Sequence, residues 1–448
     1  SPKLCDELKR LYKLKLITIE QREFQDKDAN DAILVYAATD SRGANKAILS
    51  ACRKKNILCC CVDGNWPEGD FTTPAITRHN QLMVSISSGG TNCRQSKLVK
   101  NSLGRHLEML DTTTLIVVGT DHNHLGVEER EPYHLSGEKY ERAGFMMMQL
   151  KGIHEFMIIN TCNRIEIIAV VPESTVENEI LPHSLGFSSL KQNKYYVKSG
   201  EKAFEHLCLV VSGMLSQTPG ENHITAQIKE ALEIARTRGW SGNMLQEWIS
   251  SALHVSKEIK NETRPHFKTE EIEEIALRYL FQKEESEKTL MVIGSGHLGK
   301  SIVKESLKSC KKIIWCYHQN KPKLETDWKN KIEIISLNQI KNKLSNVNKI
   351  ISAATTNGYI LTTAHAPFFD LEKSTHIIDL GMPRTIDPDL QNISADIHVL
   401  DLDGIKNWNR PGLCHFYDFL SNSRKIIDSQ MYLYEKITNN FQGWNSTE

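Results

Sequence analysis

Short apolar runs alternate with amphipathic segments along most of this chain of 448 residues. Runs rich in Val and Ile predict buried strands, and leucines at helical spacing predict helices. The predicted strands cover residues 32–38, 57–62, 82–87, 115–118, 156–160, 165–171, 290–293, 313–317, 349–353 and 376–380. The predicted helices cover residues 4–11, 45–54, 222–237, 266–288, 300–309 and, as a single closing helix, 420–441. This alternation is typical of an α/β protein with several domains.

Changes in the pattern predict the domain boundaries. A first α/β unit covers residues 1–112 and ends in a polar run. A second unit of mixed α+β character follows at 113–265, and a charged helical segment at 266–288 connects it to the next unit. The third unit, 289–405, opens with a strand, a glycine-rich loop and a helix, which is the order of a Rossmann domain. A short helical segment, 406–448, completes the chain.

Composition restricts the partners and the compartment. Lys+Arg and Asp+Glu both number 55, so any nucleic acid must be held by local basic patches, and we expect no DNA partner. No apolar run is long enough to cross a bilayer and no secretory leader is evident, so we expect no membrane partner. The 11 cysteines are odd in number and irregularly spaced, which favours the reducing cytoplasm over a disulfide framework.

Two clusters resemble metal sites but are better explained otherwise. Cys59, Cys60 and Cys61 are adjacent in a predicted strand, where alternate side chains face opposite ways, so core packing is the better interpretation. His122 and His124 offer two ligands without an evident third. We therefore assign no metal ligand from the sequence.

Cys162 occupies the most informative position in the chain. It lies in the break Thr161–Arg164 between two apolar strands, two residues before a fixed cation. A thiolate is the reactive form of cysteine, and a nearby Arg lowers the thiol pKa. An isolated cysteine in an apolar strand is more often an inert core residue. A hydride-carrier motif further along the chain favours a nucleophile that forms a thioester.

That motif is the loop of Gly294, Ser295, Gly296, His297, Leu298 and Gly299, which follows a predicted strand and opens a helix. The next predicted strand ends without an acidic residue, which would favour NAD. His318 and Lys321 stand there instead and fit the 2′-phosphate of NADP. The alternative is that Lys321 belongs to a solvated lysine-rich stretch.

Residues 113–430 resemble the glutamyl-tRNA reductase family, which starts tetrapyrrole biosynthesis. The most specific piece is Thr161-Cys162-Asn163-Arg164-Ile165-Glu166. The supporting motifs are Asp121-His122, Glu128-Glu129-Arg130, Val211–Ser216, Gly220–Lys229, the glycine loop and Asp379–Arg384. Three positions depart from the family pattern: His223 stands in place of Gln, Leu215 in place of an acid, and Thr385 in place of Asp.

The resemblance implies the chemistry. Cys162 would attack the ester of charged tRNA(Glu), and NADPH would reduce the resulting thioester to glutamate-1-semialdehyde. Arg164 would hold the substrate carboxylate, and His206 would assist proton transfer or orient the ester. The glycine loop, His318 and Lys321 would bind the cofactor. Thr161, Asn163, Ser216, Glu221 and Gln227 would complete the substrate site. The resemblance also implies a homodimer and, as a further partner, glutamate-1-semialdehyde aminomutase.

Residues 1–110 resemble a different family, precorrin-2 dehydrogenase, the siroheme-synthase module that often doubles as a ferrochelatase. The matching motifs are Ala37–Asp40, Asn45, Val62-Asp63, Asp70–Ala75 and Ile86–Gly90. By this resemblance Asp63 is the general base, Ser88 lies in the tetrapyrrole cleft, and NAD is the cofactor. The chain begins at Ser1-Pro2, without the first strand and glycine loop of that fold. We therefore expect residues to be missing before Ser1 and NAD binding to be weak.

Two other functions stay open. The departures at 215, 223 and 385 are compatible with a non-catalytic regulator of the tetrapyrrole pathway that kept the fold. Zero net charge is compatible with an NADP enzyme that reduces a small thioester without tRNA. The retained Thr161, Cys162, Arg164 and Ser216 favour the reductase.

Overall fold

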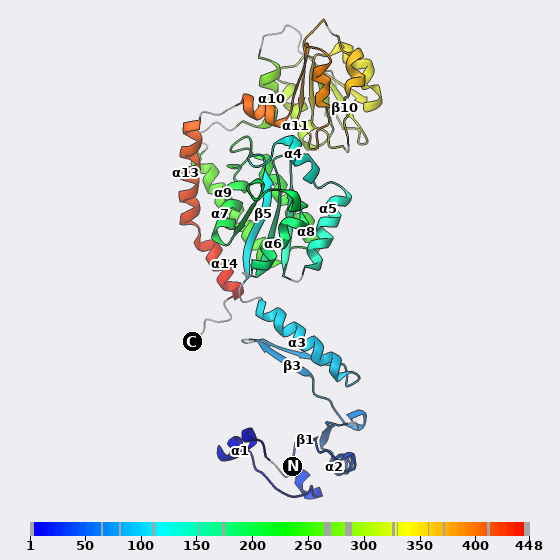
Figure 1. Cartoon of the computed structure of the whole chain (residues 1–448), viewed down its shortest axis with the longest axis vertical. Coiled ribbons are helices and arrows are strands. Elements are labelled where there is room, and N and C mark those ends of the chain that lie inside the picture. Colours follow the sequence, from blue (N-terminus) through cyan, green and yellow to red (C-terminus); the bar gives the residue numbers. More distant parts are fainter. Residues whose placement is uncertain are drawn as a thin grey trace. The chain divides into compact units, whose positions relative to one another are not determined.

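The structure is a computed structural model of the whole chain (Figure 1). It describes residues 4–63, 66–79, 82–109, 113–150, 152–172, 175–263, 270–282, 289–324, 328, 330–356, 358–370, 372–409 and 413–442. The described residues divide into two compact units, one within residues 1–111 and the other within 112–443. The mixture of α/β units, a Rossmann-like parallel sheet and a helical C-terminal segment confirms the predicted fold class.

The first unit contains two small sheets. Its elements are α1 (Asp6–Lys13), β1 (Leu34–Ala37), α2 (Arg42–Lys54), β2 (Leu58–Cys61), β3 (Ala75–His79), β4 (Leu82–Ile86) and α3 (Cys93–Met109). Strands β1 and β2 pair in parallel, and β3 and β4 pair antiparallel. Ser41 caps α2 by accepting a hydrogen bond from the backbone N–H of Ala44, which is why the helix begins there. The three adjacent cysteines of β2 are buried in the core, as expected.

The second unit begins with a four-stranded antiparallel sheet in the order β6-β7-β5-β8. Every residue of β5 and β7 is buried, so the sheet is covered on both faces. Helices α6, α7 and α9 pack on these strands. The elements of this part are β5 (Thr113–Asp121), α4 (Val127–Arg130), α5 (Glu138–Gln149), β6 (Glu155–Asn160), β7 (Arg164–Pro172), α6 (Thr175–Ser184), β8 (Tyr196–Ser199), α7 (Glu201–Val211), α8 (His223–Thr237) and α9 (Asn243–Thr263).

The six-stranded parallel sheet that follows has the order β11-β10-β9-β12-β13-β14. In chain order this is the doubly wound arrangement, whose crevice lies at the carboxyl ends of β9 and β12, where the strand order reverses. The elements are α10 (Ile272–Leu280), β9 (Thr289–Ile293), α11 (His297–Ser306), β10 (Lys312–Tyr317), β11 (Ile332–Ser336), β12 (Lys349–Ser352), β13 (Thr375–Asp379), β14 (Ile397–Leu400) and α12 (Leu402–Trp408). The strands of this sheet are near-continuous apolar runs because helices cover both faces.

Three expectations about helices and strands need correction. The closing helix is two helices, α13 (Leu413–Ser429) and α14 (Tyr432–Gln442), which pack against α9 (Figure 1). The connecting helix is shorter than predicted: α10 covers only Ile272–Leu280, and residues 266–269 and 283–288 lie outside the described residues. Strands β3, β8, β11 and β14 were missed; in β3, polar Thr77, Arg78 and His79 interrupt the apolar pattern. None of the described helices has the length and hydropathy of a membrane span.

Candidate active site

The turn that carries Cys162 is built by its neighbour Thr161. Strand β6 ends at Asn160 and β7 begins at Arg164. The backbone N–H of Thr161 donates to the Arg164 carbonyl at 2.9 Å. The Thr161 hydroxyl accepts hydrogen bonds from the backbone N–H groups of Asn163 and Arg164, both at 3.2 Å. The Thr161 side chain therefore holds a tight turn with Cys162 at its tip.

A second residue, Arg130, holds the same turn from outside. Its guanidinium is fully buried, and its Nη2 donates to the Cys162 carbonyl at 2.9 Å. Nη1 donates to the Leu125 carbonyl. The sequence analysis included Arg130 only as part of a motif, because an Arg that follows two glutamates has no local signature of burial. The structure thus adds a positioning residue for the candidate nucleophile.

The Cys162 side chain is partly buried and lies beside the nucleotide-binding part of the unit. It packs against an apolar cluster that includes Val127 and, from the parallel sheet, Leu290 and Val292. Burial and, to a smaller extent, the charge of Glu221 raise the pKa of this thiol to about 11, although Arg130 opposes them. The expectation that Arg164 lowers this pKa is wrong, because burial outweighs the nearby cations and Arg164 is bound elsewhere.

Arg164 is bound to Glu166, two positions along β7, where both side chains lie on the same face of the strand. Its Nη1 donates to Glu166 Oε1 at 2.9 Å, and its Nη2 donates to the Leu215 carbonyl. Arg164 Nε has no partner among the described residues. Burial disfavours the charge on Glu166, but Arg164 and His206 outweigh it and hold the carboxyl pKa at about 2. The pair is therefore ionised inside the core.

Two further side chains contact the same carboxylate oxygen of Glu166, Oε1. His206 Nε2, from α7, lies 2.8 Å from it, and the Tyr196 hydroxyl, from β8, donates to it. The rings of Tyr196 and His206 have centroids 5.0 Å apart. Sequence analysis predicted Arg164 and His206 separately and gave Glu166 and Tyr196 no role. The Arg-x-Glu spacing in a strand was the signal that could have shown Glu166.

Three other predicted residues meet beside the turn. The Asn163 amide Nδ2 donates to Glu221 Oε1 at 3.3 Å, while Asn163 Oδ1 has no described partner. Burial raises the pKa of Glu221, and the hydroxyl of Ser216 opposes that rise. All three side chains are buried. Gln227, half-buried on α8, lies one helical turn after His223.

The glycine loop has the shape that a dinucleotide needs. Gly294 has φ +116°, and a Cβ there would lie 2.7 Å from the Ala353 carbonyl oxygen. A Cβ on Gly299 would lie 2.2 Å from the Gly294 carbonyl oxygen, so this residue allows α11 to approach the loop. A Cβ on Gly296 would meet nothing within 4 Å. Gly296 thus borders open space at the N-terminus of α11, where a phosphate binds favourably.

A cavity of about 240 Å³ lies above this loop, at the carboxyl ends of β9, β10 and β12. Ser295 and His318 line it, and the Ser295 hydroxyl donates to the Asn320 carbonyl at 2.8 Å. His297 and Leu298 begin α11, and Lys321 is exposed just beyond β10. These residues fit the pyrophosphate and adenosine half of a nicotinamide dinucleotide.

Polar contacts tie the two sheets of the second unit together. Arg384, after β13, forms a bidentate ion pair with Glu131, with Nε and Nη2 at 2.9 and 3.0 Å. Asp403 accepts a hydrogen bond from the Val127 backbone N–H at 2.7 Å and one from Gln217 at 3.2 Å. These contacts hold the Cys162 turn beside the nucleotide-binding sheet.

The two predicted residues of the first unit are held by local partners. Asp63 Oδ2 accepts a hydrogen bond from the Asn45 amide at 2.6 Å. The Ser88 hydroxyl accepts one from the backbone N–H of Asn92, near the start of α3. His124, in the second unit, pairs with Asp121 at 2.6 Å, and burial lowers the pKa of His122 to about 3. Within the described part of the chain these two histidines belong to no three-ligand cluster.

Known proteins resemble this chain over both parts of the second unit. The family model "Glutamyl-tRNAGlu reductase, N-terminal domain" matches residues 118–263, and "Shikimate / quinate 5-dehydrogenase" matches residues 275–408. The glutamyl-tRNA reductase of Alkaliphilus metalliredigens is 26% identical over 331 residues, covering 72% of this chain and 78% of its own. That of Alkaliphilus oremlandii is 25% identical, covering 65% and 87%.

These matches identify the chain as an oxidoreductase related to the glutamyl-tRNA reductases. Among solved structures, the glutamyl-tRNA reductase from Methanopyrus kandleri is 21% identical with a TM-score of 0.36, covering 73% of this chain and 79% of its own. An NAD(P)-binding family model matches residues 1–75. The matches at residues 1–75 and 275–408 therefore lie on either side of the match at residues 118–263.

Proposed function

We propose that this chain reduces glutamyl-tRNA(Glu) to glutamate-1-semialdehyde with NADPH, through a thioester on Cys162. The observation that carries the proposal is the position of that thiol. It stands at the tip of a braced turn and packs against the apolar cluster of the sheet whose glycine loop fits a dinucleotide. A substrate carbonyl bound to the sulfur would thus lie on the side from which hydride is supplied.

The proposed reaction has two steps, formation of the thioester and its reduction. The Cys162 sulfur attacks the ester carbonyl carbon, the carbon–oxygen bond to the ribose breaks, and the tRNA leaves with a hydroxyl. With the cofactor bound, hydride would add to the thioester carbon, and the carbon–sulfur bond would break to give the aldehyde and the Cys162 thiolate. The nicotinamide cofactor supplies the hydride when bound.

The chain's own residues prepare the first step. Since the thiol is neutral at pH 7, its proton must leave during attack. Glu221, whose charge acts on the thiol and whose own pKa is raised, is the proton acceptor that we assign. Arg164 Nε and Asn163 Oδ1, both buried without a described partner, supply a donor for the glutamyl carboxylate and an acceptor for its ammonium group. His206 positions Glu166, which in turn holds Arg164.

The cofactor preference follows from the residues around the adenosine end. His318 lines the cavity and Lys321 follows on the exposed loop, and no described residue of this cavity is acidic. A basic side chain favours a 2′-phosphate over a free hydroxyl. We therefore assign NADPH over NADH.

For the first unit we propose a second activity, oxidation of precorrin-2 to sirohydrochlorin with NAD. The NAD(P)-binding match over residues 1–75 supports it, and Asp63, held by Asn45, is the base that we assign. Its test is NAD reduction with precorrin-2 by the wild type and by Asp63→Asn. Turnover that this substitution leaves unchanged would remove Asp63 from the reaction.

Further proposals concern the cellular compartment, the oligomeric state and a partner enzyme. All cysteines among the described residues are free thiols, which fits a reducing cytoplasm. We also propose a homodimer that passes its reactive aldehyde to glutamate-1-semialdehyde aminomutase. Light scattering and co-purification test these two partners directly.

The decisive experiment follows NADPH oxidation with charged glutamyl-tRNA beside uncharged tRNA plus free glutamate. We expect turnover only with the charged tRNA, inhibition by a thiol reagent, and protection by substrate. Turnover with glutamate linked to coenzyme A alone would favour the small-thioester reductase. A folded protein that turns over no acyl donor would favour the regulator.

A further inference from the structure

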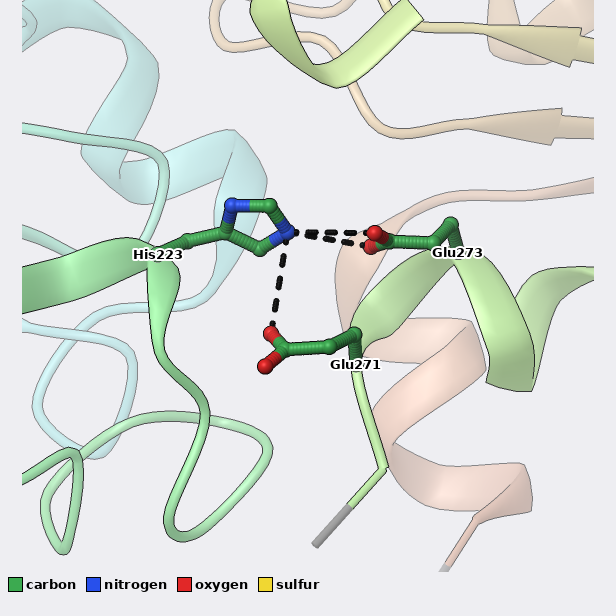
Figure 2. A group of neighbouring side chains, drawn as sticks. All are labelled: His223, Glu271 and Glu273. Atoms are coloured by element: carbon green, nitrogen blue, oxygen red, sulfur yellow. Dashed lines mark hydrogen bonds and ion pairs between the residues drawn. The ribbon is translucent and has the colours of Figure 1, made fainter. Parts of the chain in front are cut away.

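A histidine and two glutamates meet where the catalytic part joins the nucleotide-binding part (Figure 2). His223 is the first residue of α8 in the catalytic part. Glu271 and Glu273 lie at the start of α10, which leads into the parallel sheet. The sequence places the histidine about 50 residues from the glutamates, so no local spacing motif predicts the cluster.

The three side chains converge on one point. His223 Nε2 lies 3.1 Å from Glu273 Oε2 and 3.6 Å from Glu271 Oε2. One ligand atom from each residue lies within 4.8 Å of the other two. Figure 2 shows both carboxylates directed at the same imidazole nitrogen.

Both carboxylates are oriented by groups outside the cluster. Glu271 Oε1 accepts hydrogen bonds from the backbone N–H and the side-chain amide of Asn222, at 3.0 and 2.8 Å. Glu273 Oε1 accepts one from the Ser301 hydroxyl. Glu271 Oε2 lies toward His223, and both oxygens of Glu273 lie within 3.2 Å of His223 Nε2. Ligands of bound metals are commonly oriented by hydrogen bonds of this kind.

The cluster carries more negative than positive charge. One imidazole faces two carboxylates, and an oxygen of each lies within 3.6 Å of His223 Nε2. Glu273 is buried, so water compensates its charge poorly. Lys260 is near the cluster, but its ammonium group donates to the oxygen atoms of Asn222 and Thr225.

We propose that His223, Glu271 and Glu273 bind a divalent first-row transition metal ion. One imidazole nitrogen and two carboxylate oxygens are a ligand set that such ions accept, with water in the remaining positions. The three ligand atoms lie within 4.8 Å of one another. Atoms that bind one metal ion at about 2.0–2.1 Å lie somewhat closer together than 4.8 Å. Small rotations of the side chains would complete the site.

The bound ion would cross-link the two parts of the enzyme. It would join α8 to α10 beside the glycine loop, since the rings of His223 and His297 have centroids 5.6 Å apart. The ion would restrain movement of the nucleotide-binding part relative to Cys162. The site is thus structural or regulatory, and it does not depend on the proposed reaction.

The test is titration of the chelator-treated full-length protein with Co²⁺ alone, followed by visible absorption and calorimetry. We expect one equivalent to bind with d–d bands and without the thiolate charge-transfer band that a cysteine ligand produces. His223→Gln and Glu273→Gln should each weaken binding at least tenfold. The matched control is His254→Gln, which removes an exposed histidine paired with one glutamate, Glu258, and should leave binding unchanged.

Three outcomes would overturn the proposal. They are no saturable binding, binding that His223→Gln leaves unchanged, and a thiolate band that disappears on cysteine alkylation. Circular dichroism of each variant establishes that it is folded. If Glu273→Gln unfolds, His223→Gln and Glu271→Gln decide alone, because both residues are only partly buried.

Discussion

The two sheets of the second unit build their sites in opposite ways. In the antiparallel sheet, strand β7 carries the fully buried ion pair of Arg164 and Glu166, and charged side chains shape the site. In the parallel sheet, the buried residues of β9 and β10 are apolar, and the site is made by the backbone of the glycine loop. Charge-removing substitutions should therefore damage the first site, and added Cβ atoms the second.

The largest effect should come from the candidate nucleophile itself. Cys162→Ser should lower turnover by at least about 10³-fold, equivalent to roughly 4 kcal/mol in the activation barrier, because a serine hydroxyl ionises far less readily than a thiol. Thermal unfolding should be unchanged. Cys93→Ser, at an exposed thiol, is the control and should retain full activity. Turnover by Cys162→Ser close to wild type would rule out the thioester.

The next largest effect is expected on stability, from breaking the buried ion pair of Arg164 and Glu166. Glu166→Gln leaves the Arg164 charge buried without its partner and should cost about 3–5 kcal/mol in the free energy of unfolding. Glu205→Gln, which breaks the exposed pair with Arg424, should cost about 0–1 kcal/mol. Chemical denaturation measures both. Equal losses would show that burial does not distinguish the two pairs.

The same pair sets a dependence on pH. The pKa of Glu166 is about 2 in the folded protein, below the ordinary value of about 4.3. Its ionisation therefore stabilises the fold above pH 4.3, and that contribution is lost as the pH falls toward 2. Stability in this acid range should fall more steeply for the wild type than for Glu166→Gln. Parallel curves would contradict the assignment.

Two glycines of the nucleotide loop should respond differently to an added Cβ. Gly299→Ala places a Cβ against the Gly294 carbonyl oxygen, so it should lower thermal stability even without cofactor. Gly296→Ala meets open space and should leave stability unchanged while weakening NADPH binding about tenfold, since we propose that the cofactor occupies that space. Fluorescence titration with NADPH compares them. Unchanged affinity in Gly296→Ala would exclude phosphate contact at this residue.

The smallest effect concerns cofactor choice. Lys321→Ala should weaken NADPH binding about fivefold and leave NADH binding unchanged, because one exposed cation contributes roughly 1 kcal/mol. Lys436→Ala, on α14, is the control and should change neither affinity. Equal weakening of both cofactors would exclude contact between Lys321 and the 2′-phosphate.

Local sequence determined much of this protein. Apolar runs predicted most strands, the glycine spacing predicted the nucleotide loop, and the break before β7 predicted a thiol at a turn. These features depend on residues close together in the chain, where backbone sterics and alternation act directly. The break between α13 and α14 and the short strand β3 were missed, because their apolar patterns do not differ from those of a continuous helix and a polar loop.

Only the tertiary structure decided what each charged residue does. Arg164 was expected to activate Cys162 and instead binds Glu166, while Arg130, from 32 residues earlier, holds the Cys162 carbonyl. Burial then set the thiol pKa against the direction that the nearby Arg suggested. The meeting of His223 with Glu273 also joins residues 50 apart. Charge effects depend on distance and solvent exposure in three dimensions, and periodicity along the chain specifies neither.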